Sequence, residues 1–466
     1  MNFDEKIPAQ VRRILKRLKD AGYEAYIVGG CVRDLLLGRD PADWDITTSA
    51  RPEQVKACFK RTLDTGIQHG TVSVLEYEQG KPVTYEITTY RIDGIYEDGR
   101  HPKQVEFTAS LSEDLRRRDF TINAMAYAPG EGLTDLFGGR EDLEKRRIRA
   151  VGDPEERFSE DALRMMRAIR FSAQLDAEVE GQTGAAILKL APTLEKVSAE
   201  RIRVELEKLL LSDHPGRFRQ FYESGLTKVF LPEWDPCMDT SQENPHHCYN
   251  VGEHILHSLE SIDTEALRME CGEEGYLRSL RILRLTMLLH DIAKPRFKKI
   301  DEAGIAHFHG HPEAGAQMAE EILKRLKYDN DTVHSVKQLV LHHEERFPAE
   351  ERALRRAMSR IGEEYFPVYF RMQEADCLAQ SSYMREEKLE RLRKLRILCD
   401  KIKKEKQPLS VKDLALGGAD LREAGVKPGP GMGAILKEML EDVIDEPEHN
   451  TREYLLKHYV YERKEA

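Results

Sequence analysis

The chain has few cysteines and lacks any long apolar run, and both absences narrow the class of protein. Seven cysteines are scattered singly through the 466 residues, with no CxxC pair. This distribution argues against a disulfide framework and against a zinc finger. No apolar run reaches the length of a membrane span, and the opening segment MNFDEKIPAQVRRILKRL lacks the apolar core of a signal peptide. We therefore expect a cytoplasmic protein without a membrane partner.

An excess of positive charge is also missing. Asp and Glu number 83 against 72 Lys and Arg, and the formal net charge is −11. This balance disfavours a uniformly basic nucleic-acid-binding protein, so any RNA contact has to rest on local basic patches. The length allows about two to four domains. No internal repeat or low-complexity segment is present.

The residue pattern changes about a third of the way along the chain. Up to about residue 150 it is mixed α/β, and from Asp153 it is helical almost to the end. We expect joints near 150–158, 232–245 and 407–410. In the first part we expect helices over 8–22 and CVRDLLLG, and strands over 24–30, 44–48, 71–77 and 83–90.

The first group of functional residues follows the strand EAYIVGG. Glycines at the turn, Gly29 and Gly30, let backbone N–H groups approach a phosphate, and Arg33 lies in the first turn of the next helix. Asp43 and Asp45 are two residues apart, so on a strand they share a face. Paired carboxylates of this kind hold the Mg²⁺ of a phosphoryl-transfer site. Taken separately, each element is also a common surface feature.

This pattern, GGCVRDLLLG followed by DWDITT, resembles the head of class II tRNA nucleotidyltransferases and bacterial poly(A) polymerases. The resemblance implies a polymerase-β-like head in which Asp43 and Asp45 bind the catalytic Mg²⁺ ions. It also implies that Gly29, Gly30 and Arg33 bind the triphosphate of the incoming nucleotide. A third carboxylate is usual in that superfamily. Glu86 is a candidate, and an exposed strand glutamate without a catalytic role is the alternative.

The second group lies between Arg91 and Asn123. The polar, glycine-containing stretch TYRIDGIYEDGRHP predicts a mobile loop. It resembles the loop that acts in the switch from C to A addition, and its presence argues against an enzyme that adds only CC. The segment RRRDFTINAMAY resembles the family's second motif. There Asp119 accepts a hydrogen bond from the ribose 2′-OH, with Arg118 and Asn123 beside it. A solvated basic turn is the alternative.

The third group is RFSEDALRMMRAIRF, which predicts one amphipathic helix with Ser159 as its N-cap. Asp161 and Arg164 then share a helix face. C and A both present an amine donor beside a ring-nitrogen acceptor, whereas U and G present the reverse. An Asp–Arg pair therefore fits C and A and mismatches U and G. An ordinary helical salt bridge is the alternative.

The segment EDALR resembles the family's EDxxR template for the incoming base. Arg167 lies near the same helix face, and we expect it and Glu160 to hold Arg164 in place. Residues 199–210, AERIRVELEKLL, resemble the fifth motif, with Arg201, Arg203 and Glu205 in a mainly structural role.

The fourth group consists of histidines and aspartates between residues 254 and 376. His290-Asp291 ends an apolar helix, and adjacent His and Asp side chains can bind one metal ion together with ligands from other helices. The pattern resembles the HD phosphohydrolase superfamily. The resemblance implies the ligands His254, His290, Asp291 and Asp376, with His311 and His342 as additional ligands and His343 as the substitute for His342. The metal would be a divalent transition metal or Mg²⁺.

The last part of the chain offers two surfaces for RNA. Residues 388–406 are strongly basic and fit an RNA backbone, although a solvated helix face fits equally well. Residues 425–440, GVKPGPGMGAILKEML, resemble the family's tail, which holds the tRNA elbow. The resemblance thus predicts an α+β head over residues 1–150, followed by an all-α neck (151–232), an HD domain (245–380) and a tail (381–466).

These expectations together predict template-independent addition of CCA to tRNA from CTP and ATP, with an added HD phosphohydrolase activity and no obligatory protein partner. The alternatives are an enzyme that adds only A, a poly(A) polymerase, or a protein that acts mainly as an HD phosphohydrolase with an RNA-binding head. A non-catalytic RNA-binding protein predicts degraded carboxylates, and Asp43 and Asp45 argue against it.

Overall fold

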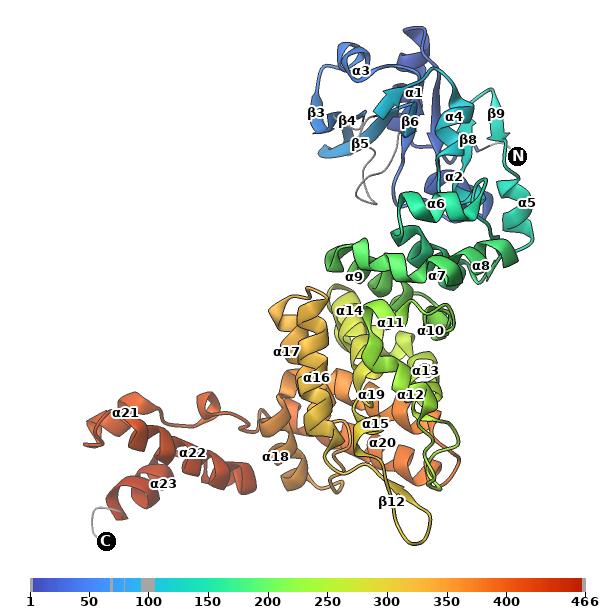
Figure 1. The fold of residues 1–466 in the computed structure, drawn as a ribbon. Helices are drawn as coiled ribbons and strands as arrows, with labels where there is room; N and C mark the ends of the chain where they lie inside the picture. The colour runs from blue at the N-terminus through green and yellow to red at the C-terminus, as the bar shows by residue number, and fades with distance from the viewer. Residues whose placement is uncertain (1–2, 68–69, 79, 94–104, 463–466) are drawn as a thin grey trace. The chain divides into compact units, whose positions relative to one another are not determined.

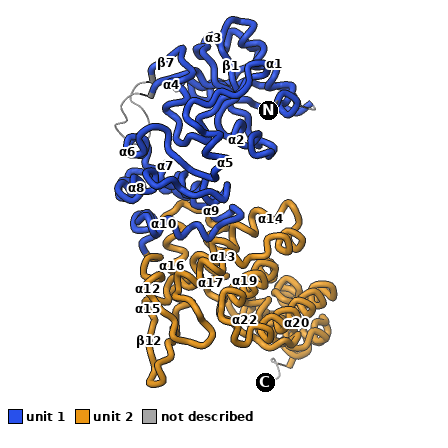
Figure 2. Tube along the Cα trace, turned by 90° about the vertical axis from the view of Figure 1, so that its right-hand side faces the viewer, with its two compact units in different colours: residues 1–232 blue, residues 233–466 orange. Residues whose placement is uncertain are grey.

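The computed structural model describes residues 3–67, 70–78, 80–93 and 105–462. The chain divides into two compact units, residues 1–232 and 233–466 (Figure 2). This boundary coincides with the expected end of the helical neck, while the finer division of each unit remains a prediction. No helix within the described residues is long and apolar enough to cross a membrane.

The described part of the first unit contains a seven-stranded sheet in the order β3-β4-β5-β2-β1-β8-β9 (Figure 1). Strand β1 lies between β2 and β8 and is antiparallel to both, whereas β2 and β5 are parallel. The strands are β1 Ala25–Val28, β2 Ile46–Thr48, β3 Thr62–Gly66, β4 Thr71–Glu78, β5 Lys81–Thr89, β8 Met125–Ala128 and β9 Gly132–Asp135. The central position of β1 places the Gly29-Gly30 turn at its end, next to the residues that precede β2.

The helices of the first unit are α1 Ala9–Asp20, α2 Gly30–Leu36, α3 Pro52–Cys58, α4 Leu111–Arg116, α5 Gly139–Glu144, α6 Pro154–Glu160, α7 Leu163–Leu175, α8 Gly181–Leu190, α9 Ala199–Leu210, α10 Arg219–Glu223 and α11 Thr227–Phe230. Helix α1 forms because Val11, Ile14, Leu15 and Leu18 recur at helical spacing, and all four are buried. They belong to the hydrophobic core that also contains Ile27 and Ile46 of the sheet. The expected α+β head is therefore confirmed.

Three expectations in the first unit need correction. Strand β2 begins at Ile46, so Asp43 and Asp45 lie in the chain just before it. The single helix expected around residue 160 is two helices, α6 and α7, which are separated by an extended Asp161 with φ −148° and ψ 103°. Asp153, not Ser159, caps α6, because its side chain accepts a hydrogen bond from the backbone N–H of Glu155.

The second unit is mainly helical, as expected. Its helices are α12 Asp235–Asp239, α13 Val251–Glu260, α14 Thr264–Leu289, α15 Lys294–Phe297, α16 His311–Arg325, α17 Asn330–Leu341, α18 Glu351–Ile361, α19 Phe366–Ala379, α20 Arg385–Lys404, α21 Gly418–Glu423, α22 Pro430–Asp445 and α23 Arg452–Leu456. A short hairpin of β12 (Lys299–Ile300) and β13 (Ala306–His307) interrupts the helices. In the first unit, β10 (Arg147–Ile148) and β11 (Glu178–Val179) form a separate parallel pair that follows the strands of the large sheet in sequence.

The loop predicted from TYRIDGIYEDGRHP lies largely outside the described residues. Its flanks form the antiparallel pair β6 (Arg91–Asp93) and β7 (Val105–Phe107). The proposed role of this loop therefore remains a prediction from the sequence.

Candidate active sites in the two units

Asp43 and Asp45 are fixed beside the glycine turn by the sheet. The backbone N–H of Val28 donates a 3.0 Å hydrogen bond to the carbonyl of Asp45, which extends the β1–β2 ladder by one residue. Asp45 thus lies next to the end of β1, where Gly29 begins the turn into α2. The sheet brings together the two elements, GG and DxD, that the sequence placed in one site.

The two carboxylates suit a divalent cation. Neither side chain makes a hydrogen bond or ion pair with another residue that the structure describes. The partial removal of water around Asp45 raises its pKa, the Arg118 charge opposes this rise, and the Asp43 charge adds to it. A divalent cation would relieve this repulsion between two carboxylates, and oxygen ligands of this kind are those that Mg²⁺ prefers.

Glu86 occupies a position that suits a third carboxylate. Ile46 of β2 pairs with Ile87 of β5, so the same register, extended by one residue, sets Glu86 beside Asp45. The Glu86 side chain is exposed. Its catalytic role remains a prediction.

Gly29 is required by the geometry of the turn. Its φ is 78°, a conformation that favours glycine, and an added Cβ would lie 3.1 Å from Nη1 of Arg118. Arg118 in turn lies 3.4 Å from the fully buried carboxylate of Asp114. Asp114 also accepts hydrogen bonds from Thr47, at 3.0 Å, and from Arg117, at 2.7 Å. Asp114, a buried acid that no sequence motif singled out, therefore holds Arg118 over the glycine turn.

Arg33 and Asn123 connect the glycine turn to the predicted ribose site. Nη1 of Arg33 donates a 2.9 Å hydrogen bond to Oδ1 of Asn123. The amide of Asn123 donates to Oδ1 of Asp119 at 3.2 Å. The predicted proximity of Asn123 to Asp119 is therefore present in the structure.

Asp119 is buried and held by several donors. Oδ1 accepts the backbone N–H of Phe120 at 2.8 Å, and Oδ2 lies 2.6 Å from Nη2 of Arg167. Burial would raise the pKa of Asp119, but the charges of Arg167 and Arg164 outweigh burial and lower the pKa to about 2. The group is thus an anionic acceptor at neutral pH. A carboxylate has about four lone-pair sites, so a ribose hydroxyl would have to share or replace one of these donors.

Arg167 has a different partner from the one expected. The sequence suggested that Arg167 and Glu160 both hold Arg164. In the structure Glu160 is paired with Arg164, whereas Arg167 binds Asp119 and lies 3.8 Å from Glu205 of α9. Arg167 therefore orients the predicted ribose acceptor instead of the base-reading arginine.

Asp161 and Arg164 do not lie on the face of one helix, because the helix is interrupted at Asp161. Its Oδ1 accepts the backbone N–H of Leu163 at 3.1 Å, and this local bond competes with a continuous helix. Arg164 is fixed separately, by hydrogen bonds to the carbonyls of Arg157 at 3.0 Å and Arg117 at 3.4 Å. Both side chains are mostly buried, with 15% of Asp161 and 12% of Arg164 exposed.

Arg201 is the partner of Asp161, a contact that sequence reasoning missed. Its Nη2 and Nη1 donate to the two carboxylate oxygens of Asp161 at 2.7 and 3.2 Å. The sequence assigned this residue of α9 to a structural role. The only signal available was its place in the motif AERIR, because the contact spans 40 residues of chain.

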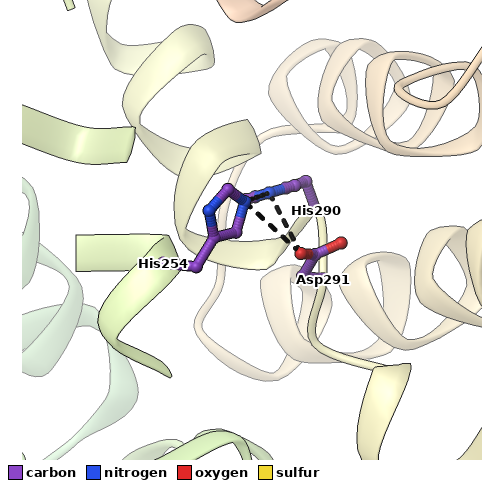
Figure 3. A group of neighbouring side chains, drawn as sticks. All are labelled: His254, His290 and Asp291. Carbon is purple, nitrogen blue, oxygen red and sulfur yellow. Dashed lines mark hydrogen bonds and ion pairs between the residues drawn. The ribbon is translucent and has the colours of Figure 1, made fainter. Parts of the chain in front are cut away.

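In the second unit, side chains from separate helices converge around Asp291. On one side, Oδ2 of Asp291 lies 3.6 Å from Nε2 of His254 and 3.4 Å from Nε2 of His290 (Figure 3). Nε2 of His254 also lies 3.0 Å from Oδ1 of Asp376. On the other side, Oδ1 of Asp291 lies 3.4 Å from Nε2 of both His311 and His343. We call these six residues the HD cluster.

The hydrogen bonds behind the HD cluster point its imidazole lone pairs inward. Nδ1 of His290 lies 2.8 Å from the carbonyl of Met287. The Nδ1 atoms of His311 and His343 contact the carbonyls of Phe308 and Val340 in the same way. A carbonyl only accepts, so each Nδ1 carries the proton and each Nε2 offers a lone pair.

These inward lone pairs fit a bound metal ion. The Nε2 atoms of His254 and His290 are 3.3 Å apart, and those of His311 and His343 are 3.2 Å apart. Lone pairs so close repel unless a cation lies between them. Both oxygens of Asp291 are buried and receive no hydrogen bond of good geometry from the part of the chain that the structure describes, although Nζ of Lys294 lies 2.7 Å from Oδ2. The donor set suits a transition metal, for which imidazole is a common ligand.

His343, not His342, belongs to the cluster. Nδ1 of His342 is bonded to Glu345 at 2.6 Å, whereas Nε2 of His343 faces His311 and Asp291. The prediction of His342 as a ligand is therefore corrected to its neighbour, which the sequence had left as the substitute. Lys294, three residues after Asp291, was not foreseen.

Three family models match successive parts of the chain. Residues 25–149 match the poly(A) polymerase head domain. Residues 177–238 match the model described as "Probable RNA and SrmB- binding site of polymerase A", and residues 301–459 match the model described as "tRNA nucleotidyltransferase domain 2 putative". The first match covers Asp43, Asp45 and Asp119.

Curated relatives share about half of their sequence with this chain over the matched part. A CCA-adding enzyme of Leuconostoc mesenteroides is 50% identical over 249 residues, which is 52% of this chain and 61% of that enzyme. A CCA-adding enzyme of Limosilactobacillus reuteri is 53% identical over 216 residues, 46% of this chain and 53% of that enzyme. The chain thus spans between half and two thirds of the curated relatives that it matches.

Solved structures extend the similarity to nearly the full chain. The Bacillus stearothermophilus CCA-adding enzyme in complex with CTP is 30% identical, with a TM-score of 0.69, over 97% of this chain and 98% of that one. The Thermotoga maritima CCA-adding enzyme complexed with tRNA shares the fold, at 21% identity and a TM-score of 0.59, over 97% of this chain and 96% of that one. The chain belongs to the nucleotidyltransferase family that contains the CCA-adding enzymes and shares its head domain with the poly(A) polymerases.

Proposed function

We propose that this protein adds C, C and A to the 3′ end of tRNA from CTP and ATP without a nucleic-acid template and releases pyrophosphate. The observation that carries the proposal is that Asp43 and Asp45, beside the Gly29 turn, have carboxylates without a partner among the residues that the structure describes. The same unit contains the buried Asp161 and Arg164 side chains that suit C and A. The names of the relatives, all CCA-adding enzymes, support this substrate class.

In this proposal Asp43 and Asp45 would hold Mg²⁺. The ion supplies electrostatic stabilisation of the attacking 3′-hydroxyl and of the leaving pyrophosphate. Gly29 and Gly30 let the backbone approach the triphosphate, and Arg33 and Arg118 offset its charge. Asp114 keeps Arg118 in place through its 3.4 Å contact.

Base selection falls to Asp161 and Arg164. Nη2 of Arg201 donates to one lone pair of Oδ2 of Asp161, at 2.7 Å. The other lone pair of this oxygen can accept a hydrogen bond from the exocyclic amine of C or A. Arg164 donates to the ring nitrogen. U and G would leave both groups without partners in a mostly buried site, which is costly. Asp119, oriented by Arg167, would accept the ribose 2′-OH.

The test is nucleotide addition to a tRNA that lacks its 3′ CCA. We expect three additions when CTP and ATP are both present and two when CTP is alone. Addition of a single A, and only to tRNA that already ends in CC, would replace the proposal with an A-adding enzyme. Repeated A addition without CTP would replace it with a poly(A) polymerase.

We also propose a second activity, a metal-dependent phosphohydrolase in the second unit. The observation that favours it is that two pairs of histidines, His254 with His290 and His311 with His343, direct their Nε2 atoms toward each other on the two sides of Asp291. A metal there would polarise a phosphate ester and assist water in attacking it. His254, His290, His311 and His343 would hold the metal together with Asp291 and Asp376, and Lys294 would offset the charge of Asp291.

Hydrolysis of a 2′,3′-cyclic phosphate or a phosphate monoester tests this activity. We expect hydrolysis that requires Mg²⁺ or a divalent transition metal and that His290→Ala abolishes. The same variant should add CCA at the normal rate. Loss of both activities in His290→Ala, or hydrolysis that persists in it, would contradict the assignment.

A further inference from the structure

One basic side chain contacts Asp376, and three more lie at the start of the adjacent helix α20, without a matching number of acids. Nη2 of Arg346 lies 3.4 Å from Oδ2 of Asp376. Lys388, Arg385 and Arg391 come from the first two turns of α20, which packs against α19. Within the described part of the chain, no carboxylate lies within ion-pair distance of any of these three.

The rest of α20 is different. Arg393 and Lys394 pair with Glu390, Arg396 with Glu270 and Glu374, and Lys401 with Glu351. These four basic residues therefore have acidic partners, in contrast to Lys388, Arg385 and Arg391 at the start of the helix.

Polar contacts connect Lys388 to the HD cluster through Gln380. Nε2 of Gln380 donates to Oδ2 of Asp376 at 2.9 Å, and Nζ of Lys388 donates to Oε1 of the same glutamine at 2.7 Å. Gln380 thus connects Lys388 to Asp376. Arg391 follows Lys388 by three positions, so the two share a helix face.

The group is partly buried and crowded with like charges. Burial lowers the pKa of Lys388, the charge of Asp376 opposes this, and the charges of Arg346 and Arg391 add to it. Burial and the charge of Arg346 likewise lower the pKa of Arg391. Nε of Arg391 is buried and has no hydrogen-bond partner among the described residues. Partly buried cations without counter-charges are unfavourable unless an anion binds there.

We propose that Arg346, Lys388 and Arg391 bind phosphate groups of an RNA 3′ end whose terminal phosphate is hydrolysed at the HD cluster. Arg346, next to Asp376, contacts the terminal phosphate. Lys388 and Arg391, farther from the cluster, contact the phosphodiester that precedes it. The inference rests on the proposed phosphohydrolase and names its substrate class: an RNA end rather than a mononucleotide.

Two substrates that differ by one adenosine and the phosphodiester that joins it test the proposal, and the variants below isolate the contribution of the phosphodiester. One is adenosine 2′,3′-cyclic phosphate, and the other is the dinucleotide ApA with a terminal 2′,3′-cyclic phosphate. We expect the wild-type protein to hydrolyse the dinucleotide with a KM about tenfold lower, because each hydrogen bond to a charged group contributes substantially. Lys388→Ala and Arg391→Ala should lower kcat/KM about tenfold more for the dinucleotide than for the mononucleotide.

Arg393→Ala is the matched control, because Arg393 lies on the same helix with its charge paired to Glu390 at 3.2 Å. Arg393→Ala should leave KM and kcat/KM unchanged for both substrates. Equal KM values for the two substrates in the wild type, or equal losses for both in the Lys388 and Arg391 variants, would overturn the proposed phosphate site.

A binding experiment separates this proposal from that of the hydrolase. If the wild type hydrolyses neither substrate with any metal, the phosphohydrolase proposal fails. Binding of the dinucleotide ApA with a 3′-phosphate is then measured by calorimetry. Binding that Arg391→Ala weakens about tenfold, and Arg393→Ala does not, supports the phosphate site. Equal binding of the dinucleotide by Arg391→Ala and Arg393→Ala, or no binding by the wild type, overturns the proposed phosphate site.

Discussion

Replacement of Arg201 by alanine should damage base selection although Arg201 itself need not touch the nucleotide. Arg201 makes two hydrogen bonds, of 2.7 and 3.2 Å, to the carboxylate of Asp161. The two side chains are 22% and 15% exposed, so solvent screens them only in part. Without Arg201, Asp161 is free to rotate away from the position in which it accepts the exocyclic amine of C or A.

The size of the effect follows from the contact. Hydrogen bonds between charged groups contribute about 1.5–3 kcal/mol, and we take about 2 kcal/mol for this partly exposed pair. Each 1.36 kcal/mol is a tenfold change in rate, so kcat/KM for CTP and ATP should fall about thirtyfold. Misincorporation of UTP and GTP should rise relative to CTP and ATP, because those bases no longer face an oriented carboxylate.

The assay is single-nucleotide addition to tRNA substrates with each of the four nucleotides. Lys208→Ala is the control, since Lys208 is exposed on the same helix and should change nothing. A melting temperature within a few degrees of the wild type establishes that Arg201→Ala is folded. If Arg201→Ala is folded and keeps the wild-type preference for C and A over U and G, the assigned role of the Asp161–Arg201 pair is wrong.

Three further results are expected. Asp119→Ala should add dATP and ATP at similar rates, because the oriented acceptor for the ribose hydroxyl is lost; continued rejection of dATP would refute that role. The pKa of Asp119 is lowered to about 2 from 3.8, so its charged form stabilises the fold above pH 3.8 and this contribution is lost as the pH falls towards 2. Asp119→Asn should therefore be less stable at pH 7 by about 2 kcal/mol in urea unfolding, with a deficit that shrinks below pH 4; a constant deficit would contradict the assignment. Removal of metal by a chelator should lower the melting temperature of the wild type but not of His290→Ala, because metal binding stabilises only a folded cluster; equal shifts would contradict a metal at that cluster.

The placement of Asp43 and Asp45 beside the glycine turn and the fold class could be predicted because their signals are local. The spacing of Gly29-Gly30, Asp43 and Asp45 fixes their placement once β1 and β2 pair. The core positions of α1 follow the helical period, so its bounds were nearly right. These features depend on short-range geometry that the sequence displays directly.

The partners of the site residues could not be predicted, because they come from distant parts of the chain. Arg201 reaches Asp161 across 40 residues, and Arg167 reaches Asp119 across 48. Such pairings depend on how helices pack and have no local signature. The break at Asp161 was missed because its carboxylate binds the Leu163 N–H, a local alternative to helix that an Asp supplies only in some contexts.

The choice between His342 and His343 failed for a related reason. Helix α17 ends at Leu341, and His342 is its C-cap. The direction of each following side chain depends on the residue at which the helix stops, and helix ends are the least certain feature of a sequence-based assignment.

The central claim is that Asp43 and Asp45 form the site of nucleotidyl transfer. The most direct measurement is the rate at which Asp43→Ala and Asp45→Ala add A to a tRNA ending in CC, with ATP binding measured alongside. We predict that both variants still bind ATP and hydrolyse the cyclic phosphate but lose A addition by at least about a thousandfold, as expected when the groups that stabilise a transition state are removed. Addition near the wild-type rate by either variant would contradict the claim.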